Sequence, residues 1–228
     1  IGKSKIGLKK PTYFIADVGA NHDGDIKRAK KLIKLCAQNG ADAVKFQHFS
    51  AETIVSDYGF KSLKSKQSHQ SKWKKSVFNT YKDASINLAW TKTLKLECKK
   101  NKIDFFTSPY SLDLVDYVDK YVCAYKIGSG DISWHQIIKK ISDKKKPVLL
   151  ATGASTLEEV KRAVKLILKK NKNLVIMQCN TNYTADEKNL NFANLNVLHT
   201  YKKKFPQAIL GLSDHTPGHI TVLGAVSF

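Results

Sequence analysis

The sequence predicts a strand–helix–strand unit over residues 147–179, PVLLATGASTLEEVKRAVKLILKKNKNLVIMQC. Residues 147–151 and 174–179 are apolar runs of strand length. Between them, Thr156-Leu157-Glu158-Glu159 has the capping-box pattern that opens a helix, and apolar residues then recur at a helical period. A helix that joins two strands in this way implies a parallel pair with a right-handed crossover.

The same alternation extends over the rest of the chain. Strands are expected at residues 13–18, 43–47, 103–107, 122–127, 147–151, 174–179 and 208–212. Helices are expected at 26–37, 88–100, 112–118, 134–141, 156–168, 190–203 and from 216 to the end. Seven βα units predict an α/β fold, a (β/α)₈ TIM barrel truncated after about seven units, with residues 1–228 as one domain. A doubly wound open sheet is the alternative, disfavoured because no GxGxxG follows the first strand.

Residues 50 to about 85 interrupt this rhythm. The stretch is rich in Ser and in the lysines Lys61, Lys64, Lys66, Lys72, Lys74 and Lys75. A long loop inside a compact domain is usually functional or mobile, so we expect a loop of one of these two kinds here.

The composition narrows the class of protein. The hydrophobic fraction of 42% is sufficient for a sizeable core. The sequence contains no run of about 18 apolar residues, so no membrane-spanning helix is predicted. The net charge is +20, but all basic residues except Arg28 and Arg162 are Lys, which argues against nucleic acid as the partner. Four cysteines without a CxxC pair favour reduced core thiols and a cytoplasmic location.

Polar side chains gather where the predicted strands end, which in a barrel is the active-site face. We expect site residues at these ends, namely Asp17, Lys45, Gln47, Ser108, Lys126, Ser129, Asp131, Thr181, Tyr183, Ser213, Asp214 and His215. So many polar strand ends are hard to explain by core packing.

Lys45 and Lys126 stand inside apolar strand patterns, where an unpaired cation is costly. They could extend to solvent at the barrel mouth, clamp the phosphate and carboxylate of an anionic substrate, or form a Schiff base. The clamp is favoured, because Gly128-Ser129-Gly130 follows Lys126 and supplies hydroxyl and backbone donors suited to phosphate.

Histidine placement suggests a metal. His215 ends the seventh predicted strand beside Asp214 and is the candidate ligand of a divalent ion. Ser213, Asp214 and His215 are adjacent and point in different directions, so a hydrolase triad is improbable. His22 is expected to organise its loop.

Five stretches together resemble the sialic acid synthase family, which includes N-acetylneuraminate, legionaminic acid, pseudaminic acid and spore-coat polysaccharide synthases. The stretches are residues 15–24, 40–47, 124–131, 151–153 and 211–216. The resemblance implies a transferase that condenses phosphoenolpyruvate with an N-acyl amino-sugar aldehyde, such as N-acetylmannosamine, aided by Mn²⁺ or Mg²⁺. The implied products are a nine-carbon 2-keto-3-deoxy acid and phosphate, formed by C–O cleavage.

The resemblance also implies roles. Lys45, Ser108, Lys126, Ser129 and Ser213 match phosphoenolpyruvate-binding positions, and Gln47, Asp131 and Tyr183 match sugar-side positions. His215 matches one of two metal-binding histidines. Thr181 stands where the family has Asn, while Asp17 and Asp131 stand where it often has Glu. We expect Asp17, Lys45, Lys126 and Asp131 to be catalytic, and Thr181 and Asp214 to bind substrate.

The family's eighth strand and C-terminal antifreeze-like domain have no counterpart in residues 1–228. We therefore expect a fragment that is inactive alone and that belongs to a homodimer when full-length, with no nucleic-acid or membrane partner. Two other functions remain open: a Schiff-base aldolase using Lys126, and a basic protein that binds polyanions without catalysis.

Overall fold

The computed structural model describes residues 1–63, 70 and 73–228. Lys64, Lys66 and Lys72 of the expected loop lie outside the described residues. The chain divides into two compact units, which are described separately below. The N-terminal unit comprises residues 13–123 with Gly2, and the C-terminal unit comprises residues 124–228 with residues 1 and 3–12.

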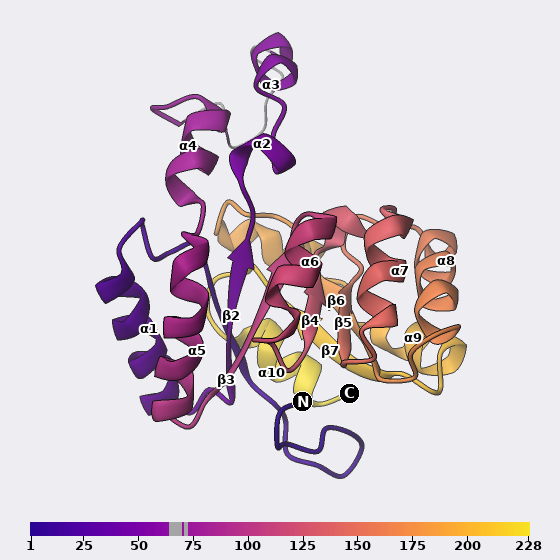
Figure 1. Ribbon diagram of the computed structural model, residues 1–228. Helices are drawn as coiled ribbons and strands as arrows, with labels where there is room; N and C mark the ends of the chain where they lie inside the picture. The colour runs from indigo at the N-terminus through magenta and orange to yellow at the C-terminus, as the bar shows by residue number, and fades with distance from the viewer. Residues whose placement is uncertain (64–69, 71–72) are drawn as a thin grey trace. The chain divides into compact units, whose positions relative to one another are not determined.

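The N-terminal unit is built on three parallel strands, β1 (Ile15–Gly19), β2 (Ala43–His48) and β3 (Asp104–Pro109). Its long helices are α1 (Ile26–Gln38), α5 (Thr91–Lys100) and α6 (Leu112–Asp119). Helices α1 and α5 lie side by side (Figure 1) and bury apolar residues such as Ile33 and Leu94. As predicted, α1 ends at Asn39-Gly40, where Gly40 has a φ of 84°.

The described part of the stretch expected to be a long loop is largely helical, so the prediction of a loop was wrong there. It contains α2 (Ala51–Ile54), α3 (Asp57–Leu63) and α4 (Val77–Ala84), followed by the 3-10 helix η3 (Leu88–Trp90). These helices have only four to eight residues. A segment this short completes too few turns to show a clear 3.6-residue period in the sequence.

The C-terminal unit has four parallel strands, β4 (Tyr125–Ile127), β5 (Val148–Ala151), β6 (Leu174–Cys179) and β7 (Ile209–Ser213), each paired with the next. Its α-helices are α7 (His135–Asp143), α8 (Leu157–Leu168), α9 (Val197–Lys204) and α10 (Ile220–Val226). Two 3-10 helices, η4 (Ser129–Asp131) and η5 (Glu187–Phe192), follow β4 and β6. The predicted alternation of parallel strands and helices is therefore present in each unit.

The sequence predicted the start of helix α8 correctly, but it predicted one helix where the structure has η5 and α9. The capping box that opens α8 is confirmed, because the Glu159 N–H donates to Thr156 Oγ1 and the Thr156 N–H donates to the Glu159 carboxylate. The single helix expected at 190–203 is instead divided into η5 and α9. The break falls at Ala193, whose backbone is extended.

Strand alternation determines which side chains share a face. A Cβ placed on Gly211 would lie 3.4 Å from side-chain atoms of both Met177 and Val175, so these three residues lie on one face of β6 and β7. Because the period of a strand is two, Ser213 lies on the same face. Lys45 and Gln47 likewise share one face of β2, while Val44 and Phe46 are buried on the other.

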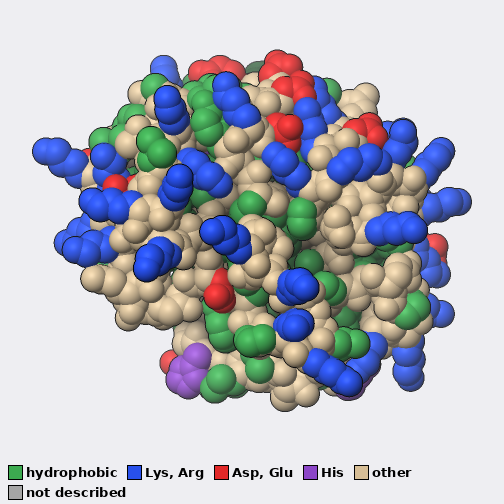
Figure 2. All heavy atoms as spheres, turned by 60° about the horizontal axis from the view of Figure 1, so that its bottom comes forward, with side chains coloured by type: hydrophobic (Ala, Val, Ile, Leu, Met, Phe, Trp, Pro, Cys, Tyr) green, Lys and Arg blue, Asp and Glu red, His purple; other side chains and the backbone are tan. Residues whose placement is uncertain are grey.

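Basic side chains are dispersed over the surface. Figure 2 shows Lys and Arg side chains scattered over the displayed face, with few acidic side chains between them. All four cysteines are free thiols, and Cys98 is buried. Within the described part of the chain, no helix combines the length and apolar character needed to cross a membrane.

Candidate functional site

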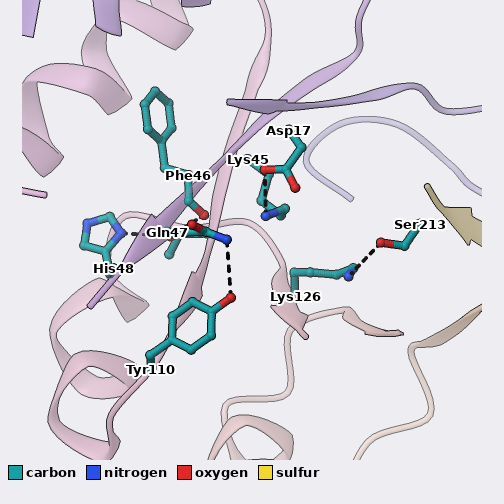
Figure 3. Close-up of polar contacts among 9 residues, drawn as sticks. Asp17, Lys45, Phe46, Gln47, His48, Tyr110, Lys126 and Ser213 are labelled. Carbon is teal, nitrogen blue, oxygen red and sulfur yellow. Dashed lines mark hydrogen bonds and ion pairs between the residues drawn. The ribbon is translucent and has the colours of Figure 1, made fainter. Parts of the chain in front are cut away.

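In the N-terminal unit, a buried lysine faces a carboxylate on the neighbouring strand. Asp17 on β1 and Lys45 on β2 are register partners, and Lys45 Nζ lies 2.8 Å from Asp17 Oδ1 (Figure 3). Lys45 is only 7% exposed, whereas the Asp17 side chain is about half exposed. The ion pair therefore orients the ammonium group while the carboxylate stays accessible to solvent and solutes.

Two further predicted residues lie next along these strands. Gln47 shares the Lys45 face, and its register partner on β3 is the buried Ser108. Gln47 Nε2 donates a hydrogen bond to the Tyr110 hydroxyl at 3.4 Å (Figure 3). The sequence analysis did not identify Tyr110, although its position directly after the third strand was an available signal.

Two histidines of this unit, His22 and His48, have structural roles. The ring nitrogens of His48 lie 2.8 Å from Thr107 Oγ1 and 2.9 Å from Thr91 Oγ1, and burial lowers the pKa of His48 to about 4. His22 Nδ1 accepts the Gly24 N–H, in agreement with the expected loop-organising role. Both imidazoles are buried.

In the C-terminal unit, the second buried lysine contacts a hydroxyl group. Lys126 on β4 is 7% exposed, and its Nζ donates to Ser213 Oγ at 3.3 Å (Figure 3). The two residues are 87 positions apart in the chain; Lys126 is the middle residue of β4, and Ser213 is the last residue of β7. The fold thus brings together two of the residues predicted to bind an anion.

Ser129 is held by the turn after β5. Its Oγ accepts the Gly153 N–H at 3.0 Å. A Cβ on Gly153 would lie 2.4 Å from Thr181 Cγ2 and 2.8 Å from the Cys179 carbonyl oxygen. The close approach of Ser129 and Thr181 therefore requires glycine at position 153, which lies in one of the five stretches that carry the family resemblance and had no role predicted from the sequence.

Asp131 has the most perturbed carboxyl group of the described residues. Burial raises its pKa to about 6, and the nearby Lys126 ammonium opposes part of that rise. A carboxyl group with this pKa exchanges its proton near neutral pH, which suits a general acid or base.

An amide network holds the loop that follows β6. Asn180 Nδ2 donates to the Asn189 carbonyl oxygen, and Asn182 Nδ2 donates to Asn189 Oδ1. Asn189 Nδ2 in turn donates to Thr184 Oγ1, and Asn189 is buried. This loop carries Thr181 and the exposed Tyr183, so the network fixes the backbone at both.

The end of β7 is organised around Asp214. Its carboxylate accepts hydrogen bonds from the Thr216 N–H, the Thr216 hydroxyl and the Thr221 hydroxyl. The next residue, His215, packs its ring against Tyr183 with 4.4 Å between the ring centroids. Thr216 and Thr221 were not identified from the sequence.

The described residues do not form a metal site by themselves. Among residues 1–63, 70 and 73–228, no three His, Cys, Asp or Glu side chains gather so that they could hold a metal ion. His215 offers one imidazole, while the neighbouring Asp214 carboxylate is engaged by threonine donors.

Known sequences identify relatives of this chain. The model of the NeuB family matches residues 32–228. An N,N'-diacetyllegionaminic acid synthase of Campylobacter jejuni is 34% identical over 225 residues, covering 96% of this chain and 65% of that protein. An N-acetylneuraminate-9-phosphate synthase of Mus musculus is 27% identical, covering 97% of this chain and 60% of that protein. The chain thus spans less than two thirds of the length of these relatives.

Solved structures show the same fold. The N-acetylneuraminic acid synthetase of Leptospira borgpetersenii, in complex with citrate, matches all of this chain and 73% of its own, with 29% identity and a TM-score of 0.84. The spore coat polysaccharide biosynthesis protein SpsE of Bacillus subtilis matches 99% of this chain and 59% of its own, with 27% identity and a TM-score of 0.80. The fold is therefore a TIM barrel-like α/β fold.

Proposed function

Because the chain belongs to the NeuB family, we propose that it condenses phosphoenolpyruvate with an N-acyl amino-sugar aldehyde, N-acetylmannosamine or an analogue. The products are a 2-keto-3-deoxy sugar acid of the sialic acid type and inorganic phosphate. The proposal concerns the activity of the whole protein and assigns its anion-binding and proton-transferring groups to residues 1–228.

The observation that carries the proposal is the buried Lys126 ammonium donating to Ser213 Oγ. A cation that is 7% exposed within a short parallel strand attracts an anion far more strongly than a surface lysine does. Ser129, held by the Gly153 N–H, adds a further hydroxyl at the end of β4.

The reaction forms one new bond at C3 and one new bond at C2 of phosphoenolpyruvate. C3 of phosphoenolpyruvate forms a bond to the aldehyde carbon, and the aldehyde oxygen takes a proton to become a hydroxyl. A water oxygen adds at C2, and the C2–O bond to phosphate then breaks to leave a ketone. The two protons of that water are accounted for by the new hydroxyl group and the departing phosphate.

The residues divide this work by their chemistry. In the C-terminal unit, Lys126, Ser129 and Ser213 are proposed to neutralise and hydrogen-bond the anion. The N-terminal unit, considered by itself, offers the Lys45 ammonium and the Ser108 hydroxyl as anion-binding groups. Asp131, with its pKa near 6, and the accessible Asp17 are the groups proposed to move protons. Gln47, Thr181 and Tyr183 are proposed to contact the amino sugar.

A divalent metal at His215, Mn²⁺ or Mg²⁺, remains a prediction. A single imidazole would leave the ion mostly water-coordinated and weakly bound. When bound, such an ion would act as a Lewis acid. Mn²⁺ binding measured by electron paramagnetic resonance should be weaker in His215→Gln than in the unaltered protein, and equal binding would contradict this prediction.

Calorimetric titration with phosphoenolpyruvate tests the central residue. Lys126→Met keeps the side-chain volume and removes the charge, so affinity should fall by about 1.5–3 kcal/mol, the contribution of a hydrogen bond to a charged group. Lys139→Met on α7 alters an exposed lysine of the same unit and should bind like the unaltered protein.

Two results would contradict the proposal. Unchanged affinity in Lys126→Met would show that this ammonium does not bind the anion. Covalent labelling of Lys126 by substrate and borohydride would favour the Schiff-base aldolase instead.

A further inference from the structure

Asp214 is surrounded by donors from its own chain. Its Oδ1 accepts the Thr216 N–H at 3.2 Å, and its Oδ2 accepts the hydroxyl groups of Thr216 at 2.6 Å and Thr221 at 2.5 Å. The two hydroxyl oxygens lie 2.7 Å apart. A carboxylate can only accept hydrogen bonds, and each hydroxyl group has one proton to donate. The Thr216 and Thr221 hydroxyl groups therefore both donate to Asp214 Oδ2.

The same cluster anchors helix α10. Of its residues, only Thr221 is buried, with 4% of its surface exposed. The apolar side chains of Ile220 and Leu223 are 65% and 62% exposed, so they contribute little to anchoring the helix. The Thr221 hydroxyl on the Asp214 carboxylate is therefore a principal link between α10 and the end of β7.

The residues on either side of Asp214 belong to the candidate site. Ser213 accepts the hydrogen bond from Lys126, and His215 packs against Tyr183. Fixing the central carboxylate limits the backbone angles through which both neighbours are oriented. A carboxylate already occupied by three protein donors is also poorly suited to bind substrate, the role that the sequence analysis gave Asp214.

We propose that Thr221, through Asp214, is a positioning residue that sets the orientation of Ser213 and His215. The effect of Thr221 on phosphoenolpyruvate binding rests on the proposed function. Its effect on the orientation of Ser213 and His215 does not. Supporting groups of this kind typically matter because a binding constellation must be held to within a fraction of an ångström.

The geometric consequence can be measured on the His215 ring. In the full-length protein labelled with ¹³C-histidine, the ring current of Tyr183 displaces the His215 Cε1–H signal, which is assigned by its loss in His215→Gln. Thr221→Val removes the hydroxyl at nearly constant shape, and we expect the signal to move toward those of exposed histidines. Thr221→Ser restores the hydroxyl and should return the signal. Thr200→Val, on α9 of the same unit, is the matched control and should leave it in place.

Binding provides the second readout. Thr221→Val should weaken phosphoenolpyruvate binding roughly tenfold, the scale of loss seen when a supporting hydrogen bond is removed, and Thr221→Ser should recover it. An unmoved His215 signal in Thr221→Val, or an equal movement in Thr200→Val, would overturn the positioning role. If the unaltered protein bound no phosphoenolpyruvate, the proposed function would fail, while the His215 signal would still decide this inference.

Discussion

Asp131 lies in an environment that favours its neutral form. Its pKa is raised to about 6 by burial, from 3.8 in the unfolded chain. The folded state therefore binds more protons than the unfolded state between these values, and stability falls as pH rises through this window. Above about pH 6 the full penalty of the buried charge is present.

Asp131→Asn should remove this penalty. We expect the variant to be more stable than the unaltered protein at pH 8 by up to about 2 kcal/mol, allowing for partial exposure, with the difference vanishing near pH 4. Urea unfolding at both pH values measures it. Asp113→Asn, at an exposed position on α6, should change stability by no more than about 0.5 kcal/mol at either pH. An Asp131→Asn variant with no advantage at pH 8 would mean that the carboxyl group is not desolvated.

Gly153 is the residue at which a single methyl group should do most harm. The added Cβ of Gly153→Ala would meet Thr181, the Cys179 carbonyl and Ser129 Oγ at 2.4–3.0 Å. We expect a loss of about 1–3 kcal/mol in stability from overpacking and weaker phosphoenolpyruvate binding, because Ser129 would be displaced.

Gly130→Ala is the matched control for stability, since a Cβ there meets nothing within 4 Å. Thermal unfolding of the two variants gives the comparison. If Gly153→Ala were as stable as the unaltered protein, the turn after β5 would be able to shift and accommodate the added methyl group without loss of stability.

Single residues differ in how far the sequence reveals them. Lys45 and Lys126 stood out because each interrupts an apolar strand pattern, and the structure places both within strands with little exposure. Tyr110 and Thr221 gave no comparable signal. Their importance comes from contacts with Gln47 and Asp214, which only the folded backbone specifies.

At the scale of the element, patterns with enough turns were predicted well and short ones were not. Helices α1 and α8 have 13 and 12 residues, so their apolar period and caps could be recognised. The helices between Ala51 and Ala84 are too short for this. The break before α9 depends on tertiary contacts, because Asn189 in η5 bonds to residues of the preceding loop.

The capping box of α8 makes an element-scale prediction. Thr156→Ala removes the hydroxyl that accepts the Glu159 N–H, and stability should fall by about 1 kcal/mol. Thr156→Ser retains the acceptor and should lose much less. Guanidinium unfolding of both variants measures the difference. Equal losses in the two variants would show that the lost methyl group, not the cap, matters.

At the scale of the whole molecule, the strand-by-strand alternation predicted the class of fold, and the relatives share it. Charge is the other property of the whole. A net charge of +20, spread over the surface in Figure 2, creates a field that attracts anions such as phosphoenolpyruvate without specifying where they bind. Specificity must come from the strand-end residues. The acceptor sugar depends on side-chain contacts that a composition or a strand pattern does not encode.

Phosphate release from phosphoenolpyruvate tests the central claim most directly. The full-length protein is incubated with Mn²⁺ and a panel of 2-acetamido hexoses, using phosphoenolpyruvate with ¹⁸O in the C2–O–P bridge. We predict phosphate release that depends on one sugar of the panel, yields a 2-keto-3-deoxy acid, carries the ¹⁸O into phosphate, and is lost in Lys126→Met. Release that is independent of every sugar, or ¹⁸O retained in the organic product, would contradict a synthase acting by C–O cleavage.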